Sequence, residues 1–479
     1  MYSVLVGYLY GFLCITLICS LCVGRAVLLT WPSSTLRLFE SSNTTLHRPM
    51  TEGELSLFGS LSSISTMIGT PLISILLEKI GRKYCAIVSS LMAVVSWAMI
   101  IASNRVEVLL SAMFVSGLSG TVFLVVPVYI SEFCQDSIRG AMTSGVIIFY
   151  GFGALLSYLL GGYLNYHTMI YVFLTLSIIG TILIAILKES PLYLMTNKRE
   201  EEAKKSIAFY RSLKTDDKEV LEEICSIKRA LNPDMDSEDN DIPEAEKLQP
   251  STEAPKKLSL WQFFKKSRST RRATVVCLVV ATASTFQGLI VVEVYAKPLF
   301  EEAVPNISGI VCSVILAVVC VCASLGAAYL SESAGRRALM IYSSFGTAIS
   351  CLVLGSQIQT HWAPSWVTAV FMYIYTVAYS LGAGIIPYVI IAEVFLPEVK
   401  LFLSMLVLEW LLFCNSAILY IFNPLLNAIG LGPIFYIFAV VCFLTSFFCF
   451  FYLPETKGMP VDVIQMSFYR KRKEILALN

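Results

Sequence analysis

Clusters of acidic and basic residues recur at matching places in the two halves of this 479-residue sequence. Glu78 and Arg82 in the first half have counterparts in Glu332 and Arg336 in the second, and each arginine is followed by a second basic residue. Carboxylates and guanidinium groups form charge-assisted hydrogen bonds, and a network of them can bias an equilibrium between two conformations. The clusters therefore predict a reversible ionic latch.

Further acid–base pairs follow the same repeat. Glu132 precedes Arg139 by seven residues, and Glu393 precedes Lys400 by seven. The offsets between matching positions run from 254 to about 266 residues, which indicates two parallel six-helix repeats with a substrate site between them. We expect these charges to pair across the halves when the cytoplasmic mouth is closed. In the alternative, the Lys and Arg residues are ordinary positive membrane anchors, but that alternative does not explain the glutamates at repeated positions. The predicted cytoplasmic gate consists of Glu78, Arg82, Glu132, Arg139, Glu189, Glu332, Arg336, Arg337, Glu393, Lys400 and Glu455.

Three charged residues, Arg25, Glu293 and Glu409, lie inside apolar stretches. Such residues usually face the interior of a helix bundle and mark a path for a substrate or an ion. We expect Arg25 and Glu293 to pair in the outer third of the membrane; in the alternative, both side chains extend to the outer lipid headgroups. Glu409 is either a protonatable group that couples transport to protons or a structural acid, and facilitated diffusion is the default prediction.

The sequence as a whole has the composition of a membrane protein. It is 56% apolar and 14% charged, with a mean hydropathy of +0.72, whereas soluble proteins are about 45–50% apolar and about 25% charged. A membrane-spanning helix needs about 20 mainly apolar residues. The apolar runs predict an all-α membrane protein with twelve transmembrane helices in two six-helix pseudo-repeats, starting near residues 4, 56, 84, 107, 141, 168, 273, 307, 338, 365, 402 and 432.

Several classes of function are excluded by what the sequence contains. The net charge of +1 gives no field that would attract nucleic acid. We find no HExxH motif, no Ser–His–Asp candidate and no glycine loop for phosphate, so we expect neither an enzyme nor a cofactor or metal site. The expected partners are a small-molecule solute and the lipid bilayer, and the chain is expected to be monomeric.

Two independent signals predict the orientation of the chain. The short loops on one side carry twelve Lys and Arg residues and those on the other carry three, which places the richer side in the cytoplasm. The glycosylation sequons at Asn43 and Asn306 both fall on the opposite, outer side. We therefore predict a multi-pass plasma-membrane protein with both termini in the cytoplasm.

The polar segments divide the chain into four parts. Residues 1–188 form the first six-helix bundle, 189–272 a cytoplasmic linker, 273–456 the second bundle and 457–479 a cytoplasmic tail. Within the linker, residues 197–214 have the charge pattern of an amphipathic helix. Residues 232–255 are acidic and poor in apolar residues, which predicts disorder, and a basic run at 265–272 meets the lipid headgroups.

These motifs resemble those of the sugar porter family of the major facilitator superfamily, over nearly the whole chain. The residues that carry the resemblance, besides the clusters at 78–83 and 332–337, are Pro127, Tyr129 and Glu132 with Arg139 and Gly140, then Lys188 to Pro191, Gly382 to Tyr388 and Pro454 to Gly458. The sequence is most similar in character to the branch of insect facilitated trehalose transporter-like proteins. The resemblance implies facilitative uniport of a sugar, such as trehalose or a hexose, by alternating access.

The positions that hold sugar hydroxyls in this family are altered here. Amide positions of the fifth and seventh spans fall on Ile147 and Ile290, and the tenth-span Trp is Tyr388; Gln287, one turn from Ser284, could restore one amide on the same face. The alternative functions are a carrier of another solute, such as an organic anion or a polyol, and a non-transporting sensor. The candidate substrate-binding residues are Arg25, Ser284, Thr285, Gln287, Glu293, Tyr295, Gly384, Tyr388 and Trp410.

Overall fold

The computed structural model describes residues 2–134, 136–231, 267–459 and 461–469, and every regular element in them is a helix. The predicted stretch 232–255, the lysines at 265–266 and the residues 470–479 lie outside the described residues. Twelve described segments are long and apolar enough to cross a membrane. The first of these segments begins at Leu13 rather than near residue 4, and the other eleven begin within five residues of the predicted starts. The all-α fold with twelve spans is therefore confirmed.

The first six spans form one half of the molecule, which we call the N-half. Its helices are α1 (Tyr2–Thr30), α2 (Pro32–Glu40), α3 (Glu52–Ile80), α4 (Arg82–Ala102), α5 (Val106–Leu118), the short 3-10 helix η1 (Ser119–Thr121), α6 (Val122–Phe133), α7 (Asp136–Tyr163) and α8 (Tyr166–Ile186). The fourth span is broken at η1, and the first span bends at Trp31, where Pro32 begins α2.

The last six spans form the C-half. Its helices are α13 (Arg268–Thr285), α14 (Leu289–Val294), α15 (Ala296–Ala303), α16 (Gly309–Ala334), α17 (Arg336–Thr360), α18 (Ser365–Leu381), α19 (Ile386–Val394), α20 (Pro397–Ile429) and α21 (Leu431–Tyr452), followed by α22 (Val461–Tyr469). The seventh span is interrupted near Gly288, which has a φ of +93°, and the tenth is interrupted between Leu381 and Ile386. The interrupted spans leave backbone groups that other residues must satisfy.

In the described part of the connection between the halves there are three shorter helices: α9 (Pro191–Thr196), α10 (Glu200–Arg211) and α11 (Lys218–Leu231). Helix α10 is the amphipathic helix predicted from residues 197–214, and it buries Ala203 and Ile207 against its neighbours. The hydroxyl of Tyr210 donates a hydrogen bond of 2.5 Å to the carbonyl oxygen of Lys188. This contact ties the connecting helices to the N-half.

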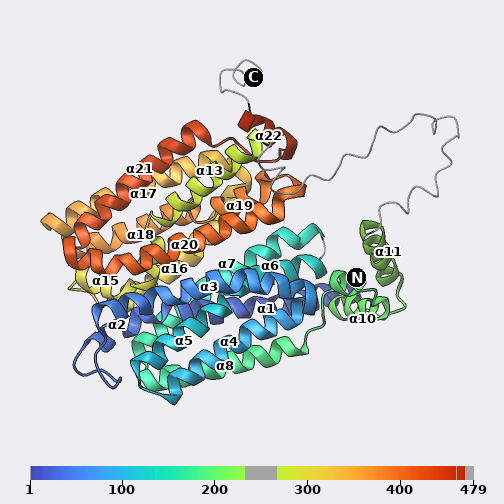
Figure 1. The fold of residues 1–479 in the computed structure, drawn as a ribbon, viewed down its shortest axis with the longest axis horizontal. Coiled ribbons are helices and arrows are strands. Elements are labelled where there is room, and N and C mark those ends of the chain that lie inside the picture. The colour runs from blue at the N-terminus through green and yellow to red at the C-terminus, as the bar shows by residue number, and fades with distance from the viewer. Residues whose placement is uncertain (1, 135, 232–266, 460, 470–479) are drawn as a thin grey trace.

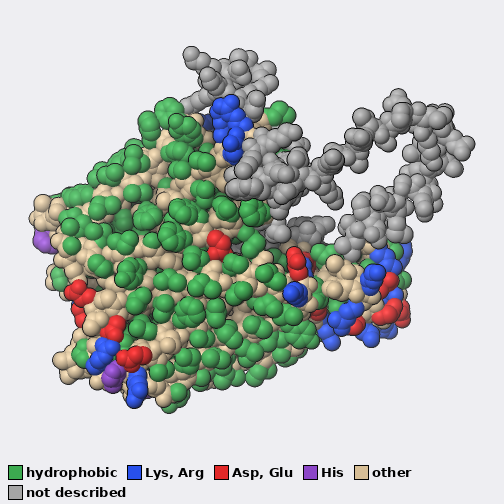
Figure 2. Space-filling model, in the orientation of Figure 1, with side chains coloured by type: hydrophobic (Ala, Val, Ile, Leu, Met, Phe, Trp, Pro, Cys, Tyr) green, Lys and Arg blue, Asp and Glu red, His purple; other side chains and the backbone are tan. Residues whose placement is uncertain are grey.

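The two halves lie side by side (Figure 1), with α3 packed against α20 and α7 against α16. We call the end formed by α2 and α15 the outer end, and the end formed by α9 to α11 and α22 the inner end, following the orientation predicted from the sequence. Figure 2 shows hydrophobic side chains over the flank of the bundle and charged side chains gathered near its two ends. This distribution is the one expected of a multi-pass membrane protein.

The buried apolar side chains are distributed differently at the two ends. One continuous cluster joins both halves at the outer end and includes Trp31 and Phe58 from the N-half with Tyr295 and Phe300 from the C-half. At the inner end, each half has a separate cluster of its own. The halves are therefore packed together on the outer side and independently packed on the inner side.

Candidate functional site

The interruptions in the seventh and tenth spans place polar groups at the middle of the C-half. The hydroxyl of Ser284 donates to the carbonyl oxygen of Ala383 at 2.6 Å, and the Tyr379 hydroxyl donates to the carbonyl oxygen of Ser284 at 3.2 Å. The Ser343 hydroxyl accepts from the backbone N–H of Ala383 at 3.1 Å. These bonds satisfy the backbone of the broken helices, as buried backbone groups require.

Several candidate residues are occupied by this packing. The amide nitrogen of Gln287 donates to Ser344 on α17 at 3.2 Å, and Gln287 is completely buried. The hydroxyl of Thr285 donates to the carbonyl oxygen of Ala281 at 3.1 Å, within its own helix. Gly384 lies against the ring of Tyr379. Gln287 follows the end of α13 and precedes Gly288, so the regular helix that would have aligned it with Ser284 is absent.

Two aromatic candidates remain accessible. Tyr388 on α19 is 50% exposed and Trp410 on α20 is 42% exposed. The indole N–H of Trp410 donates to the hydroxyl of Thr282 on α13 at 2.8 Å, which fixes the orientation of the ring. These rings could contact the apolar face of a bound ring-shaped solute.

Glu293 on α14 lies where the halves meet. Tyr150 on α7 donates a hydrogen bond of 3.1 Å to its Oε2 atom, and Tyr158, two turns further along α7, donates to its backbone carbonyl at 2.5 Å. Hydroxyl groups of the N-half therefore contact both the carboxylate and the backbone of Glu293.

Tyr295, two residues further along the chain, is fully buried at the outer end. Its hydroxyl donates to the carbonyl oxygen of Leu419 on α20 at 3.2 Å, and its ring stacks on Phe422 with 5.1 Å between the centroids. Gly59 of α3 approaches the same hydroxyl from the other half, so closely that any larger residue there would overlap it. Tyr295 thus forms part of the contact between the halves.

Arg25 does not pair with Glu293 in this structure. It is 5% exposed, and it donates to the Ser62 hydroxyl at 2.6 Å, to the Thr66 hydroxyl at 3.2 Å and to the Ser116 carbonyl oxygen at 3.5 Å. The side chain extends across the N-half toward α3 and α5 rather than toward the C-half, so the predicted ion pair is absent. The sequence gives the depth of Arg25 in the membrane but not the rotation of α1 that directs it.

A pocket of about 230 Å³ lies beside Arg25 within the N-half, between α1, α4 and α8. The Nε atom of Arg25 has no hydrogen-bond partner in the described part of the chain. On α20, the Oε1 atom of the half-buried Glu409 is likewise without a partner among the described residues.

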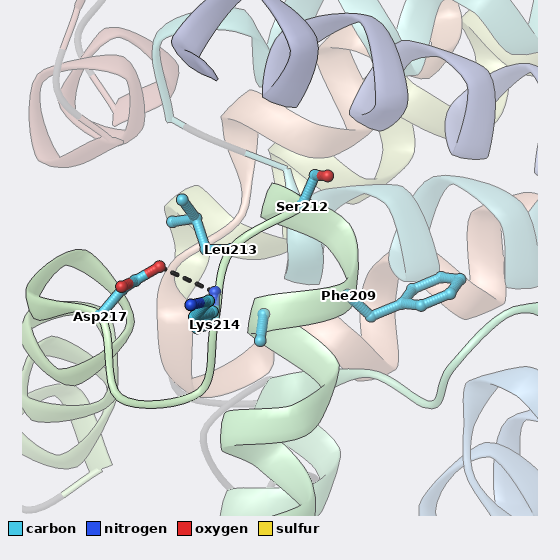
Figure 3. Close-up of a pocket in the computed structure, with 6 residues that line it drawn as sticks. Phe209, Ser212, Leu213, Lys214 and Asp217 are labelled. Atoms are coloured by element: carbon cyan, nitrogen blue, oxygen red, sulfur yellow. Dashed lines mark hydrogen bonds between the residues drawn. The ribbon is translucent and has the colours of Figure 1, made fainter.

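A second pocket lies on the connecting helices (Figure 3). It is beside the loop where Asp217 accepts the N–H of Lys214 at 2.8 Å. This pocket is remote from the contact between the halves.

The predicted gate charges of the N-half form a network at the inner end. Arg82 donates to Glu132 from Nε at 2.9 Å and from Nη2 at 2.7 Å, and Ser190 also bonds to Glu132. The carboxylate of Glu189 accepts the backbone N–H groups of Arg82 at 2.9 Å and Lys83 at 3.1 Å, and so caps the start of α4. Burial raises the pKa of Glu189 above its usual value, and the backbone donors oppose this shift.

The C-half repeats this network. Arg336 donates to Glu393 at 2.7 Å, and the Thr456 hydroxyl donates to the same carboxylate at 2.6 Å. Glu455 accepts the backbone N–H groups of Arg336 at 2.8 Å and Arg337 at 3.2 Å at the start of α17. The two networks match group for group.

The turns before these helices explain the glycine in each motif. Gly81 and Gly335 have φ values of +95° and +86°, which L side chains rarely adopt. A Cβ atom at Gly335 would lie 2.6 Å from Oε2 of Glu455, and one at Gly81 would overlap Glu189. Glycine is therefore needed both for the turn and for the approach of the capping carboxylate.

The described gate residues pair within each half rather than across the halves. Each arginine is held by a glutamate of its own repeat. Pairing across the halves, which is expected when the inner end is closed, stays a prediction, because the two halves are packed separately at the inner end of this structure. Glu78 and Lys400 are exposed, and Arg337 donates to the carbonyl oxygen of Phe450 at 2.7 Å. The side chains of Arg139 and Glu332 lie outside the described residues.

Polar contacts between the halves occur instead at the outer end. Arg37 on α2 forms an ion pair of 2.9 Å with Glu301 on α15, and the Ser33 hydroxyl accepts the backbone N–H of Lys297 at 2.8 Å. In both contacts the partners are 264 positions apart in the sequence. Equivalent positions of the two repeats therefore meet, as expected for contacts close to a pseudo-two-fold axis.

Sequence reasoning did not identify Tyr158 or the Arg37–Glu301 contact. One signal in the sequence could have indicated the outer contact: Arg37 and Glu301 are separated by 264 positions, close to the offset at which the inner motifs repeat. The two predicted sequons also lie at the outer end, where Asn43 and Asn306 are both exposed.

Comparisons with known proteins agree with this architecture. The family model described as sugar (and other) transporter matches residues 26–468. The chain is 25% identical over 454 residues to the facilitated trehalose transporter Tret1 of Polypedilum vanderplanki, covering 93% of this chain and 85% of that protein. It is 26% identical over 455 residues to Tret1 of Drosophila virilis, covering 93% of this chain and 47% of that protein.

Solved structures show the same fold. The inward-open xylose transporter XylE of E. coli superimposes with a TM-score of 0.76 at 17% identity, over 95% of this chain and 99% of that chain. The partially occluded inward-open form of XylE gives a TM-score of 0.74 at 18% identity, over 94% of this chain and 99% of that chain.

Proposed function

Because the chain belongs to the sugar (and other) transporter family, we propose that it is a facilitative uniporter that carries a sugar such as trehalose or a hexose by alternating access. The relatives with the printed name facilitated trehalose transporter support both the solute class and the uniport mode. Members of this family are transporters and not enzymes.

The observation that carries the proposal is the unequal packing of the two ends. One apolar cluster joins the halves at the outer end, whereas each half has its own cluster at the inner end. A carrier whose site is open to the inside needs this arrangement, and the opposite state follows when the halves rock about the site. The structure thus has the features of the inward-facing state of such a cycle.

The inner networks have a second role in this proposal, in addition to the predicted pairing across the halves. Since Arg82 pairs with Glu132 and Arg336 with Glu393, each network joins several helices of one half into a rigid unit. Rigid halves are a requirement for rocking motion, because a deformable half would absorb the movement. The exposed Glu78 and Lys400 remain available to meet the other half when the inner end closes.

The proposed location is the plasma membrane, with both termini in the cytoplasm and the chain acting as a monomer. The exposed sequons at Asn43 and Asn306, both at the outer end, support this orientation. Epitope tags at the two termini, probed in intact and permeabilised cells, test it: both tags should become accessible only after permeabilisation.

The function is tested by uptake of radiolabelled trehalose and D-glucose into oocytes that express the protein, with and without a proton ionophore. We expect saturable uptake of at least one sugar that survives dissipation of the pH gradient. Uptake that stops with the ionophore would instead assign proton coupling, for which Glu409 is the candidate group, and uptake of neither sugar would reject the proposed solute class.

A further inference from the structure

The contact between Glu293 and α7 has a chemistry that the proposed transport can use. Tyr150 of the N-half places a hydroxyl 3.1 Å from a carboxylate oxygen of the C-half. No Lys or Arg forms an ion pair with Glu293 in the part of the chain that the structure describes. The carboxylate therefore has a hydroxyl as its partner, and that partner leaves when the halves separate at the outer end.

We propose that Glu293 is the residue that receives the hydroxyl groups of the solute, and that the Tyr150 hydroxyl takes their place when the outer end is closed. A carboxylate has two oxygens and about four acceptor positions, so it can receive adjacent hydroxyls of one polyol together. The proposal rests on the proposed sugar transport and names the group that distinguishes this site. It assigns the substrate class as a solute with neighbouring hydroxyl groups.

The surroundings of Glu293 fit such a solute. Positions that would supply amides in the resemblance drawn from the sequence hold Ile147 and Ile290, and the amide nitrogen of Gln287 is directed at Ser344. The oxygen of Gln287 has no partner among the described residues, but Gln287 is completely buried. An accessible acceptor must therefore come from elsewhere, and Glu293 lies where the halves meet. Tyr388 on α19 is half exposed and offers an aromatic face for the apolar side of a sugar ring.

The two charged side chains of α1 and α14 each have neutral partners. Glu293 accepts a hydrogen bond from the Tyr150 hydroxyl. Arg25 has no acidic partner in the described part of the chain and donates only to neutral oxygens. The carboxylate of Glu293 is therefore not committed to an ion pair with Arg25.

The exchange of hydroxyls makes a prediction that a merely structural role does not. Solute and Tyr150 compete for the same carboxylate, so Tyr150→Phe removes the competitor while it keeps the ring. We expect the KM for external sugar to fall severalfold, and the maximal rate to fall because the outer end closes less readily. Tyr163→Phe, on the same helix and 69% exposed, is the matched control and should change neither.

Substitution of the carboxylate completes the test, with surface expression measured for each variant. Glu293→Gln keeps the shape but has a weaker acceptor, so KM should rise about tenfold; Glu293→Ala should raise it further. Monodeoxy analogues of D-glucose lack one of two neighbouring hydroxyls, so they should inhibit uptake of labelled D-glucose by the wild-type protein only weakly. In Glu293→Ala, the difference in inhibition between D-glucose and these analogues should be smaller.

The outcomes separate this inference from the proposed function. A wild-type protein that transports no sugar rejects the proposed function itself. Sugar transport with an unchanged KM in Glu293→Ala, or an unchanged KM in Tyr150→Phe, overturns the hydroxyl exchange alone. Uptake of tetraethylammonium that Glu293→Gln abolishes would overturn it in favour of a cation site.

Discussion

Each inner network depends on one glutamate whose carboxylate caps a helix. Glu189 caps α4 and Glu455 caps α17, and the arginine that starts each helix is held in turn by a second glutamate. The first glutamate satisfies backbone N–H groups that would otherwise lack partners, while the second fixes the arginine side chain. At the scale of single residues, the repeated motifs therefore stabilise helix ends.

The buried position of Glu189 predicts a dependence of stability on pH. Burial raises its pKa in the folded chain, so the folded chain holds the proton more tightly than the unfolded chain does. As the pH rises through the range above the usual value of about 4.3, the stability contributed by this group falls. Glu189→Gln removes this titrating group. As the pH rises from low to neutral, the Tm of wild type should therefore fall relative to the Tm of the variant.

Thermal unfolding of the purified protein in detergent measures this effect, with the exposed Glu78→Gln as the control for loss of a charge. A difference in Tm between wild type and Glu189→Gln that is independent of pH, or that has the opposite sign, would show that burial does not govern this carboxyl.

Residue types at the site were predictable from sequence, but their partners were not. Buried charges at Arg25 and Glu293 are visible in a sequence because they interrupt apolar runs. Their contacts depend on how α1 and α14 are rotated, and on the hydroxyl groups within reach. Arg25 binds Ser62 and Thr66, and Glu293 binds Tyr150, so each charge is satisfied without the other.

At the scale of elements, close approach of helices decides where the halves meet. A Cβ atom at Gly59 on α3 would overlap the hydroxyl of Tyr295, which is held on its other side by the Leu419 carbonyl oxygen. Gly153 on α7 is equally tight, since a Cβ there would lie 2.5 Å from the carbonyl oxygen of Val23. The first contact joins the halves and the second lies within the N-half.

Alanine at these two glycines should therefore have different effects. Gly59→Ala should separate the halves at the outer end and raise the reactivity of a cysteine introduced as Lys297→Cys toward a membrane-impermeant maleimide by severalfold. Gly153→Ala should lower thermal stability, by about 1–3 kcal/mol, without raising that reactivity. Equal labelling of the two variants would contradict the assignment of Gly59 to the contact between the halves.

The sequence predicted the number and ends of the spans because hydropathy and charge depend on local composition. It did not predict the interruptions. The seventh span reads as one apolar run, and only the turn at Gly288 separates α13 from α14. The tenth span breaks where Ser284 and Ser343 bind the backbone of Ala383. Such breaks are stabilised by residues from other helices, which a single stretch of sequence does not reveal.

For the whole molecule, the outer contacts couple the two halves. The continuous apolar cluster joins the two halves at the outer end. Arg37 and Glu301 form an ion pair of 2.9 Å at the same end. An exposed ion pair contributes about 0–1 kcal/mol, so this one adjusts the balance between two conformations rather than holding one of them shut.

Charge reversal at the outer pair should shift that balance by about fivefold or less. Arg37→Glu places two carboxylates together and should favour the outward-open state, and Glu301→Arg should do the same by bringing two cations together. The double exchange should restore the wild-type balance, measured by labelling of Lys297→Cys. Failure of the double exchange to restore it would show that the two residues act separately.

Facilitative transport of a sugar is the central claim, and entrance counterflow in proteoliposomes tests it most directly. Vesicles preloaded with unlabelled trehalose or D-glucose, without a pH gradient, should accumulate the radiolabelled sugar transiently above its external concentration. Such an overshoot requires a carrier that exchanges its solute and needs no ion gradient. Equilibration without an overshoot, or no entry of either sugar, would contradict the account.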